Sequence, residues 1–368
     1  MPDAESDVTP ALKEIFDARR MRHIAAETAA VFPGFDTKRF LALVLADLDS
    51  LSIMQRLRRV AEGLHATLPA DYRQALGVLR GLAPRLNHGF VTMALPEYAA
   101  LYGAGDVPAS MEALKFFTRF GSSEYAVRHF LQRDLEGTLA VMKRWSTDKN
   151  EHVRRLASEG SRPRLPWSFQ IKPLMTDPSP LAPILENLKD DPSLYVRRSV
   201  ANSLNDITKD NPEWALERIE GWSLDSPGTA WIAKHALRSL VKKGDRRALA
   251  VMGAGEAAEV ELKGLKVSPK AIQLGESIAL SVALHSTSAK SQRLVVDYGI
   301  HYVKKSGGTA VKVFKLKTFT LAPHAVEQLS RSQSIRNFTT RVHYAGRHEV
   351  EVFVNGQPCG RTAFTLST

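Results

Sequence analysis

The stretch DKNEHVRR at residues 148–155 decides the fold, because it returns 43 positions later as DPSLYVRR at 191–198. A shorter copy, YAVRH, stands at 125–129, and a weaker one, AWIAK, stands at 230–234. From about residue 108 onward, helix, short polar turn and helix recur in this order. Helix pairs with a period near 40 residues are typical of HEAT-like α-solenoids. Each pair buries its apolar face only by stacking on its neighbours, so the repeat predicts an α-solenoid.

The residues before the repeat are also expected to be helical. Apolar side chains recur at helical spacing over 10–100, and Pro33-Gly34, Pro69 and Pro84 separate the runs. Asp36-Thr37 and Asp71 stand where helix-capping side chains are expected.

The pattern changes once, near residue 255. Alternating apolar and polar residues, rich in β-branched side chains, then mark short strands at 278–284, 294–298, 311–316 and 350–354. About seven or eight such runs indicate a β-sandwich of immunoglobulin-like type. Residues 252–256, MGAGE, are the expected hinge. The predicted domains are therefore a solenoid at 1–254 and a sandwich at 255–368.

Composition limits the class of protein. With 368 residues, 44% of them hydrophobic and 24% charged, the chain is ordinary globular protein. Its one cysteine, Cys359, excludes an internal disulfide framework and a cysteine-cluster zinc site, and it fits a reducing compartment. Residues 1–5 lack a signal-peptide pattern, and the apolar run 40–48 is too short to cross a bilayer. We expect a soluble, cytoplasmic protein.

Charge favours a polyanion partner, most often nucleic acid. The chain has 50 Lys and Arg against 39 Asp and Glu, for a net charge of +11. Residues from 256 on contribute +7 of this excess. Basic loops at 288–293 and 304–308, with Lys304 and Lys305, are expected to reach a nucleic-acid groove. The alternative is that they are solvated hairpin tips.

The second helix of each repeat has a polar stripe. After Ser193, the side chains of Val196, Val200 and Leu204 face the core at spacing i, i+4, i+8. The opposite stripe holds Arg198, Asn202 and Asp206; its equivalents are Arg155, Glu159 and Arg162 one repeat earlier, and Lys234, Arg238 and Lys242 one repeat later. Two interpretations stand. The Arg155 and Glu159 pair is only a surface salt bridge, or the stripes form a groove that follows phosphates.

Carboxylates are the anomaly in such a groove, because Glu124, Glu159 and Asp206 would repel phosphate. Stabilisation of an oxocarbenium-like sugar during hydrolysis of an N-glycosidic bond would explain them. Trp167 follows RPRLP at 162–166, where two prolines exclude regular helix. Its indole would pack on deoxyribose or on a cationic base. The alternative is a Trp167 that plugs the junction between repeats.

Other chemistries find little support. The sequence has no P-loop and no His-Glu-x-x-His motif. Ser122, Ser123 and Cys359 have no evident base partner for nucleophilic catalysis. No lysine is recognisably desolvated, which argues against a Schiff-base lyase.

These residues resemble a known family. SSEYAVRH at 122–129, the run from Trp145 to Trp167, the run from Asp191 to Asp206, and VFPGFD at 31–36 continuing to Leu48 are similar to the AlkC branch of the AlkC/AlkD alkylpurine DNA glycosylases. The similarity spans essentially all of the helical part. Some AlkC members carry a C-terminal immunoglobulin-like domain, which the β-rich region resembles in kind.

The resemblance implies a monofunctional glycosylase that removes cationic N-alkylated bases, such as 3-methyladenine and 3-methylcytosine, from duplex DNA. It implies action without base flipping and without a metal or organic cofactor. Separately, a monomer is the simplest expectation for the oligomeric state. Asp206 matches the catalytic aspartate, Trp167 an aromatic residue at the lesion, and Glu124 and Glu159 further acidic residues of the site. Arg155 and Arg162 match basic residues beside them.

Charge and stripe position add further expectations. The residues expected to bind DNA are Arg155, Arg162, Arg198, Lys234, Arg238, Lys304 and Lys305. The flanking Arg198 is also expected to keep Asp206 charged. Two rival functions remain: a non-enzymatic nucleic-acid scaffold or damage sensor, and a solenoid whose basic groove binds an acidic protein.

Overall fold

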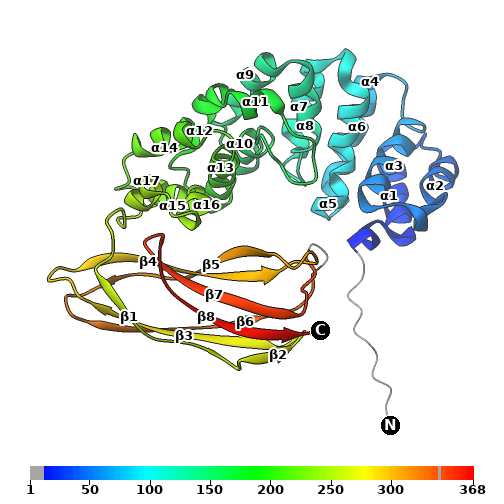
Figure 1. The fold of residues 1–368 in the computed structure, drawn as a ribbon. Helices are drawn as coiled ribbons and strands as arrows, with labels where there is room; N and C mark the ends of the chain where they lie inside the picture. Colours follow the sequence, from blue (N-terminus) through cyan, green and yellow to red (C-terminus); the bar gives the residue numbers. More distant parts are fainter. Residues whose placement is uncertain (1–11, 339–340) are drawn as a thin grey trace, which may run out of the picture. The chain divides into compact units, whose positions relative to one another are not determined.

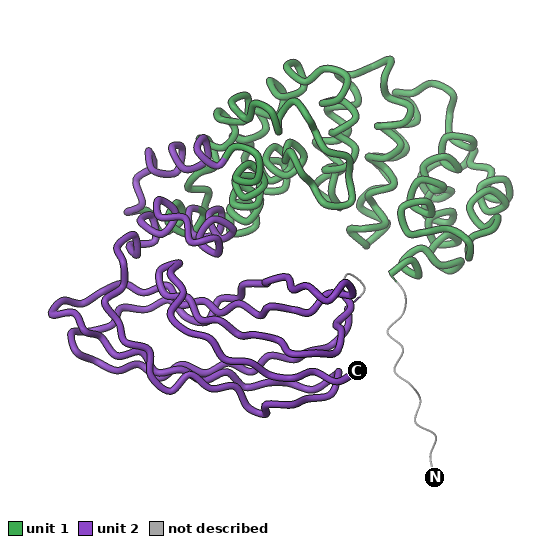
Figure 2. The backbone as a smooth tube through the Cα atoms, viewed as in Figure 1, with its two compact units in different colours: residues 1–211, 226–232 green, residues 212–225, 233–368 purple. Residues whose placement is uncertain are grey.

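The structure is a computed structural model that describes residues 12–338 and 341–368. The expectation that residues 1–5 do not belong to a signal peptide concerns residues outside these ranges. The chain forms two compact units, one of residues 1–211 with 226–232 and the other of residues 212–225 with 233–368 (Figure 2). Within the described ranges, no helix is both long and apolar enough to cross a membrane.

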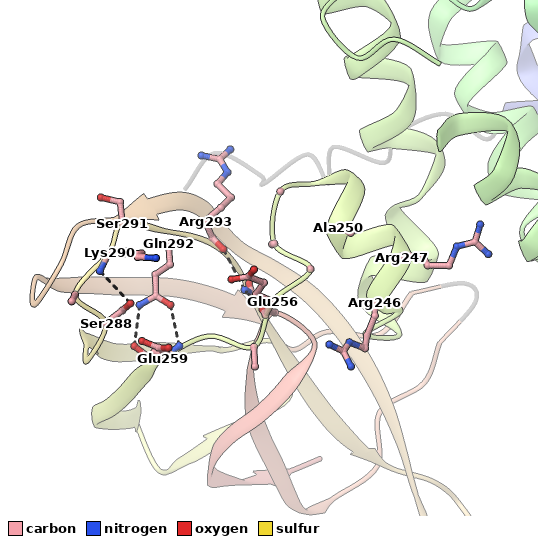
Figure 3. Close-up of a pocket in the computed structure, with 16 residues that line it drawn as sticks. Arg246, Arg247, Ala250, Glu256, Glu259, Ser288, Lys290, Ser291, Gln292 and Arg293 are labelled. Carbon is pink, nitrogen blue, oxygen red and sulfur yellow. Dashed lines mark hydrogen bonds between the residues drawn. The ribbon is translucent and has the colours of Figure 1, made fainter. Parts of the chain in front are cut away.

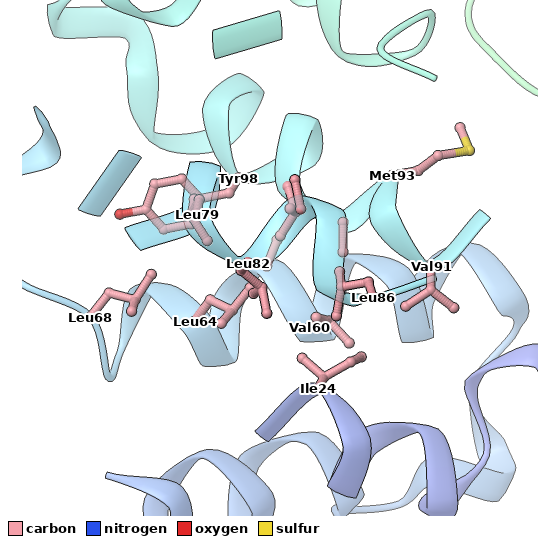
Figure 4. Close-up of a cluster of buried hydrophobic side chains, with 14 of the residues drawn as sticks. Ile24, Val60, Leu64, Leu68, Leu79, Leu82, Leu86, Val91, Met93 and Tyr98 are labelled. Atoms are coloured by element: carbon pink, nitrogen blue, oxygen red, sulfur yellow. The ribbon is translucent and has the colours of Figure 1, made fainter. Parts of the chain in front are cut away.

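The first unit is helical and begins with a layer of helices on a shared apolar core (Figure 1). These are α1 (Ala18–Val31), α2 (Thr37–Leu45), α3 (Ile53–His65), α4 (Tyr72–Leu82), α5 (Gly89–Thr92), α6 (Ala94–Tyr102) and α7 (Val107–Phe117). The predicted caps are confirmed, since the Asp36 and Asp71 side chains accept backbone N–H groups in the first turns of α2 and α4. Figure 4 shows Ile24, Val60 and Leu64 among the buried side chains that join these helices.

The repeated stretches build the rest of this unit. Its helices are α8 (Ala126–Arg133), α9 (Leu135–Trp145), α10 (Glu151–Glu159), α11 (Lys172–Thr176), α12 (Ala182–Leu188) and α13 (Leu194–Ile207). The two best copies of the repeat open α10 and α13, which pack on each other. Arg154 of the first copy donates from Nε to Asp191 Oδ2 of the second at 2.6 Å. The predicted α-solenoid is confirmed.

The second unit combines the last helices with all the strands. Its helices are α14 (Pro212–Glu220), the end of α15 (Pro227–Ala236), α16 (Arg238–Lys242) and α17 (Arg246–Val251). Helix gives way to strand between Val251 and Val260, although the compact units divide earlier in the chain. The domain boundary at 254/255 therefore stays a prediction.

The strands form the predicted β-sandwich. They are β1 (Val260–Ser268), β2 (Ala271–Gln273), β3 (Ser277–Ser286), β4 (Gln292–Val303), β5 (Thr309–Leu321), β6 (Val326–Ser334), β7 (Gly346–Val354) and β8 (Gln357–Ser367). Within the described residues one sheet has the order β1-β3-β6 and the other β2-β8-β7-β4-β5. The alternation read from the sequence is real: Ile278, Leu280, Val282 and Leu284 of β3 are all buried.

One buried carboxylate of the sandwich lacks a direct partner among the described residues. Asp297 of β4 is 6% exposed and sits at an irregularity in the pairing of β4 with β5. Burial raises the pKa of its carboxyl to about 6, although the charges of Lys315 and Lys242 act in the opposite direction. The described residues place no hydrogen-bond donor or ion-pair partner on this carboxylate, so its charged form is costly.

We expect Asp297→Asn to stabilise the protein, and more so at neutral pH. The folded pKa lies above the ordinary value of 3.8, so stability is present at low pH and is lost as pH rises through 6. The gain should be about 2 kcal/mol at pH 7.5 and below about 1 kcal/mol at pH 4.5, measured by urea unfolding of the full chain.

A matched control has the opposite sign. Hydrogen bonds from Arg164 lower the pKa of the Asp210 carboxyl, so this carboxylate stabilises the fold above its ordinary pKa. Asp210→Asn should therefore lower stability at pH 7.5. An Asp297→Asn variant that loses stability at both pH values would contradict the cost assigned to the buried carboxylate.

Candidate active site

Five of the predicted site residues form one continuous row of ion pairs. Arg155 pairs with Glu124 and, at 3.6 Å, with Glu159. Arg162 Nη1 lies 2.6 Å from Glu159 Oε1, and its Nε lies 2.8 Å from Asp206 Oδ2. All five side chains are largely buried, with exposures between 4% and 14%. The row alternates in sign, which is what allows it to be buried.

The repeat places these side chains. Arg155 and Glu159 stand one turn apart on α10, and Arg162 follows three residues after Glu159, where the helix has ended. Asp206 stands near the C-terminal end of α13, the helix one repeat later. Glu124 precedes α8, and the Ser122 hydroxyl fixes it by donating to Glu124 Oε2 at 2.8 Å. The interpretation of Arg155 and Glu159 as an isolated surface salt bridge is wrong, because both belong to this buried row.

The cation partners of Asp206 differ from the one expected. Its carboxylate is 3% exposed and binds Arg162 at 2.8 Å and Lys209 Nζ at 2.9 Å. Arg198 lies on the same helix but is exposed, and it makes no ion pair with Asp206. The reason is helical geometry: a residue eight positions away is about 12 Å distant, whereas one three positions away is a neighbour. Arg198 remains a prediction only as a DNA contact.

The row is strongly coupled electrostatically. Burial lowers the pKa of the Arg155 guanidinium, but the charges of Glu124 and Glu159 outweigh it, and the net pKa is raised. For Arg162, Glu159 and Asp206 outweigh burial in the same way. The adjoining Tyr125 hydroxyl has a pKa raised to about 12, by burial and then by the charge of Glu124. Both arginines therefore stay charged.

Tyr195 is a site residue that sequence reasoning missed. Its ring lies 5.2 Å from the Arg155 guanidinium carbon and is 39% exposed. It stands 11 positions before Asp206 on α13, which rotates it by only about 20° around the helix axis. The same periodicity that identified the polar stripe could have found it. There its ring makes a cation–π contact with one face of the Arg155 guanidinium.

Trp167 is exposed and its backbone is strained. The side chain is 63% exposed, and φ is +63°, in the left-handed region that bulky residues rarely adopt. The interpretation of Trp167 as a plug between repeats is therefore wrong. Buried Leu165 and the double hydrogen bond from Arg164 to Asp210 anchor the chain on its N-terminal side. The indole is thus presented to solvent by a fixed loop, five residues after Arg162.

The other predicted DNA-binding residues lie in the second unit. Lys234 is in α15 and Arg238 opens α16. Lys304 and Lys305 occupy the β4–β5 turn, which is closed by a hydrogen bond from Lys304 N to Gly308 O at 2.7 Å. With Lys312 and Arg341 they line a small groove of about 360 Å³. No other predicted cation is brought into this groove.

A larger groove, of about 910 Å³, lies between the end of α17 and the basic loop 288–293 (Figure 3). Arg246, Lys290 and Arg293 line it, together with Glu256 and Glu259. The loop is tied down because the Gln292 side chain exchanges hydrogen bonds with the backbone of Glu259, at 3.0 and 2.9 Å. The predicted basic loop is thus part of an ordered, mainly cationic surface.

Comparison with known proteins decides the family. A structure described as Pseudomonas fluorescens alkylpurine DNA glycosylase AlkC, bound to DNA containing an abasic site analog, is 59% identical to this chain. It covers 98% of this chain and 100% of that one, with a TM-score of 0.96. This chain belongs to the AlkC family.

Further matches agree with this AlkC assignment. The model of the DNA alkylation repair enzyme family matches residues 117–240, a range that contains the whole ion-pair row. The model of the C-terminal Ig-like domain of uncharacterised protein YhaZ matches residues 261–368. The uncharacterised protein YhaZ of Bacillus subtilis is 43% identical over 347 residues, covering 94% of this AlkC-family chain and 96% of its own length.

We expect the two cations on Asp206 to contribute unequally to stability. Arg162 is 9% exposed and serves two buried carboxylates, whereas the Lys209 side chain is 47% exposed. Arg162→Met should cost about 3–5 kcal/mol, because it leaves Glu159 and Asp206 short of a buried partner. Lys209→Met should cost less than about 1 kcal/mol. Urea unfolding compares them, and equal losses would contradict the assignment of Arg162 as the central pair.

Proposed function

We propose that this chain is a monofunctional DNA glycosylase that hydrolyses the N-glycosidic bond of cationic N-alkylated bases in duplex DNA. The proposed substrates are 3-methyladenine and 3-methylcytosine. The observation that supports this best is the buried row in which Glu124, Glu159 and Asp206 alternate with Arg155 and Arg162. The protein's net positive charge otherwise suits phosphate, yet this row contains three carboxylates. A site that stabilises a developing positive charge needs such carboxylates.

The chemistry needs little from the protein beyond this charge. An alkylated base already carries a positive charge, so it leaves without a proton from a general acid. The bond from C1′ to the base nitrogen breaks, and its electron pair leaves with the base, which becomes neutral. Asp206 would stabilise the oxocarbenium-like sugar and orient a water whose oxygen attacks C1′. The proton lost by that water would pass to Asp206 or to solvent.

The surroundings of Asp206 support water, rather than a lysine, as the nucleophile. Lys209, which contacts Asp206, is about half exposed and held in an ion pair. A lysine that forms a Schiff base is instead desolvated or placed beside another cation. This supports hydrolysis without a lyase step.

Contacts with DNA would come from both units. The AlkC relative is bound to DNA that contains an abasic site analog. In this chain the exposed Trp167 would pack on the sugar or the cationic base, and a fixed aromatic placed against the lesion suits excision without flipping. Arg198, Lys234 and Arg238, and the Lys304 and Lys305 turn, would follow phosphates and make binding depend on salt. We propose a monomer that acts in the cytoplasm without cofactor.

Base release tests this function. Duplex DNA treated with a methylating agent should lose 3-methyladenine or 3-methylcytosine, identified by mass, when incubated with the protein. Asp206→Asn keeps the shape of the side chain but removes its charge, and single-turnover release should fall about 100- to 1000-fold. Asp106→Asn is the matched control, because Asp106 also pairs with an arginine, Arg73 at 2.6 Å, and is partly exposed, but lies in the N-terminal helical layer away from the ion-pair row. It should keep its rate within about threefold.

Other outcomes favour the rivals. No release by the wild-type protein, with tight duplex binding retained, would indicate a scaffold or damage sensor. Equal binding to DNA and to other polyanions, with a shallow salt dependence, would indicate an acidic protein partner. Normal release by Asp206→Asn would remove Asp206 from the mechanism.

We expect Trp167→Asn to separate activity from stability. Asparagine tolerates a positive φ, so the variant relieves backbone strain of about 1 kcal/mol, and the exposed indole loses little packing. The melting temperature should therefore stay the same or rise while base release falls at least about tenfold. A lower melting temperature with unchanged release would show that Trp167 serves the fold alone.

A further inference from the structure

Arg128 of α8 is a buried charge for which the proposed chemistry has no direct use. Arg128 is 0% exposed to solvent, and no carboxylate of the described residues lies within ion-pair distance of its guanidinium. Burial, followed by the charge of Arg162, lowers the pKa of its guanidinium to about 10. Its Nε atom is buried without a hydrogen-bond partner. A charge buried at such cost requires a structural or functional explanation.

The Nη1 and Nη2 atoms of the guanidinium donate hydrogen bonds to three backbone carbonyls. Nη1 donates to Gly160 O at 3.0 Å and to Arg162 O at 2.6 Å. Nη2 donates to Phe169 O, and the Phe169 ring lies 5.4 Å from the guanidinium carbon. One side chain therefore grips both ends of the segment 160–169, which leaves α10 and returns beside α8.

This segment carries two site residues in demanding positions. Arg162 must reach Glu159 on one side and Asp206 on the other, at 2.6 and 2.8 Å. Trp167 must stay at a positive φ with its indole in solvent. Strained backbone of this kind persists only where the surrounding structure holds it. The backbone hydrogen bond from Ile171 N to Pro163 O, at 3.0 Å, closes the loop but does not tie it to α8.

We propose that Arg128 is a positioning residue that clamps segment 160–169, so that Arg162 meets Asp206 and Trp167 faces the DNA. The proposal rests on the function proposed above. It depends on the planar fork of arginine, which directs several N–H groups at fixed angles. A lysine in the same place keeps the positive charge but cannot bridge carbonyls at both ends of the segment. Arg128→Lys thus separates clamping from charge.

The chain offers a matched control in Arg56 of α3. It too is 0% exposed, and it also donates to three backbone carbonyls: Leu51 O at 3.3 Å, Lys13 O at 3.0 Å and Phe16 O at 3.2 Å. These carbonyls belong to the N-terminal helical layer, and none belongs to segment 160–169. Arg56→Lys therefore imitates the loss of a buried arginine without touching the site.

The experiment measures three quantities on full-length Arg128→Lys, Arg56→Lys and wild-type protein. They are amide hydrogen exchange of segment 160–171, binding to a duplex with an abasic-site analogue, and single-turnover release of 3-methyladenine. In Arg128→Lys we expect segment exchange to accelerate about tenfold or more and release to slow about 30- to 100-fold. Binding should weaken less than about fivefold. Arg56→Lys should lower the melting temperature but leave all three quantities near wild type.

Each contrary result has its own meaning. Unchanged exchange of segment 160–171 in Arg128→Lys would overturn the clamp, and faster exchange with wild-type release would overturn its role in positioning. Parallel losses of release in Arg128→Lys and Arg56→Lys would show a general folding defect and also overturn the proposal. A wild-type protein that releases no base would refute the proposed function instead, while exchange would still decide whether Arg128 holds the segment.

Discussion

The two ion pairs of Arg162 are the interaction on which the rest of the site depends. The side chain comes from a non-helical segment, and its partners Glu159 and Asp206 come from the ends of two consecutive repeats. A buried charge is tolerable only when it is paired with good geometry. The stacking of α10 on α13 and the path of the connecting segment must therefore bring Arg162 within hydrogen-bond distance of both carboxylates.

This constraint explains why the segment between the repeats is unusual. It contains two prolines and a strained Trp167, and the Arg128 guanidinium of α8 donates hydrogen bonds to its two ends. Local cost of this kind is found where function requires it, and the surrounding structure compensates for it. Here the apolar packing of the solenoid helices compensates for the energetic cost of the strain and of the buried charge.

The β-sandwich follows a different rule. Its interior is mainly apolar and alternates along the first half of β3, whereas cations such as Lys304 and Lys305 lie at turns. Two of its carboxylates are buried: Glu351 pairs with His301 and Arg361, whereas Asp297 has no direct partner among the described residues. The solenoid thus buries charge in a paired row, while the sandwich mostly keeps its charge at the surface.

The sequence by itself determined the repeats, the helix caps, the strand pattern and most members of the ion-pair row. Each depends on spacing within one element or on a period carried from repeat to repeat, so periodicity suffices to find it. Only the tertiary structure decided that Arg162, from the segment after α10, pairs with Asp206, and that Trp167 is exposed. Only it showed that Arg128 bridges a segment more than 30 residues away. These features depend on how irregular segments bring distant atoms together, and such distances are not encoded in the spacing of residues along the chain.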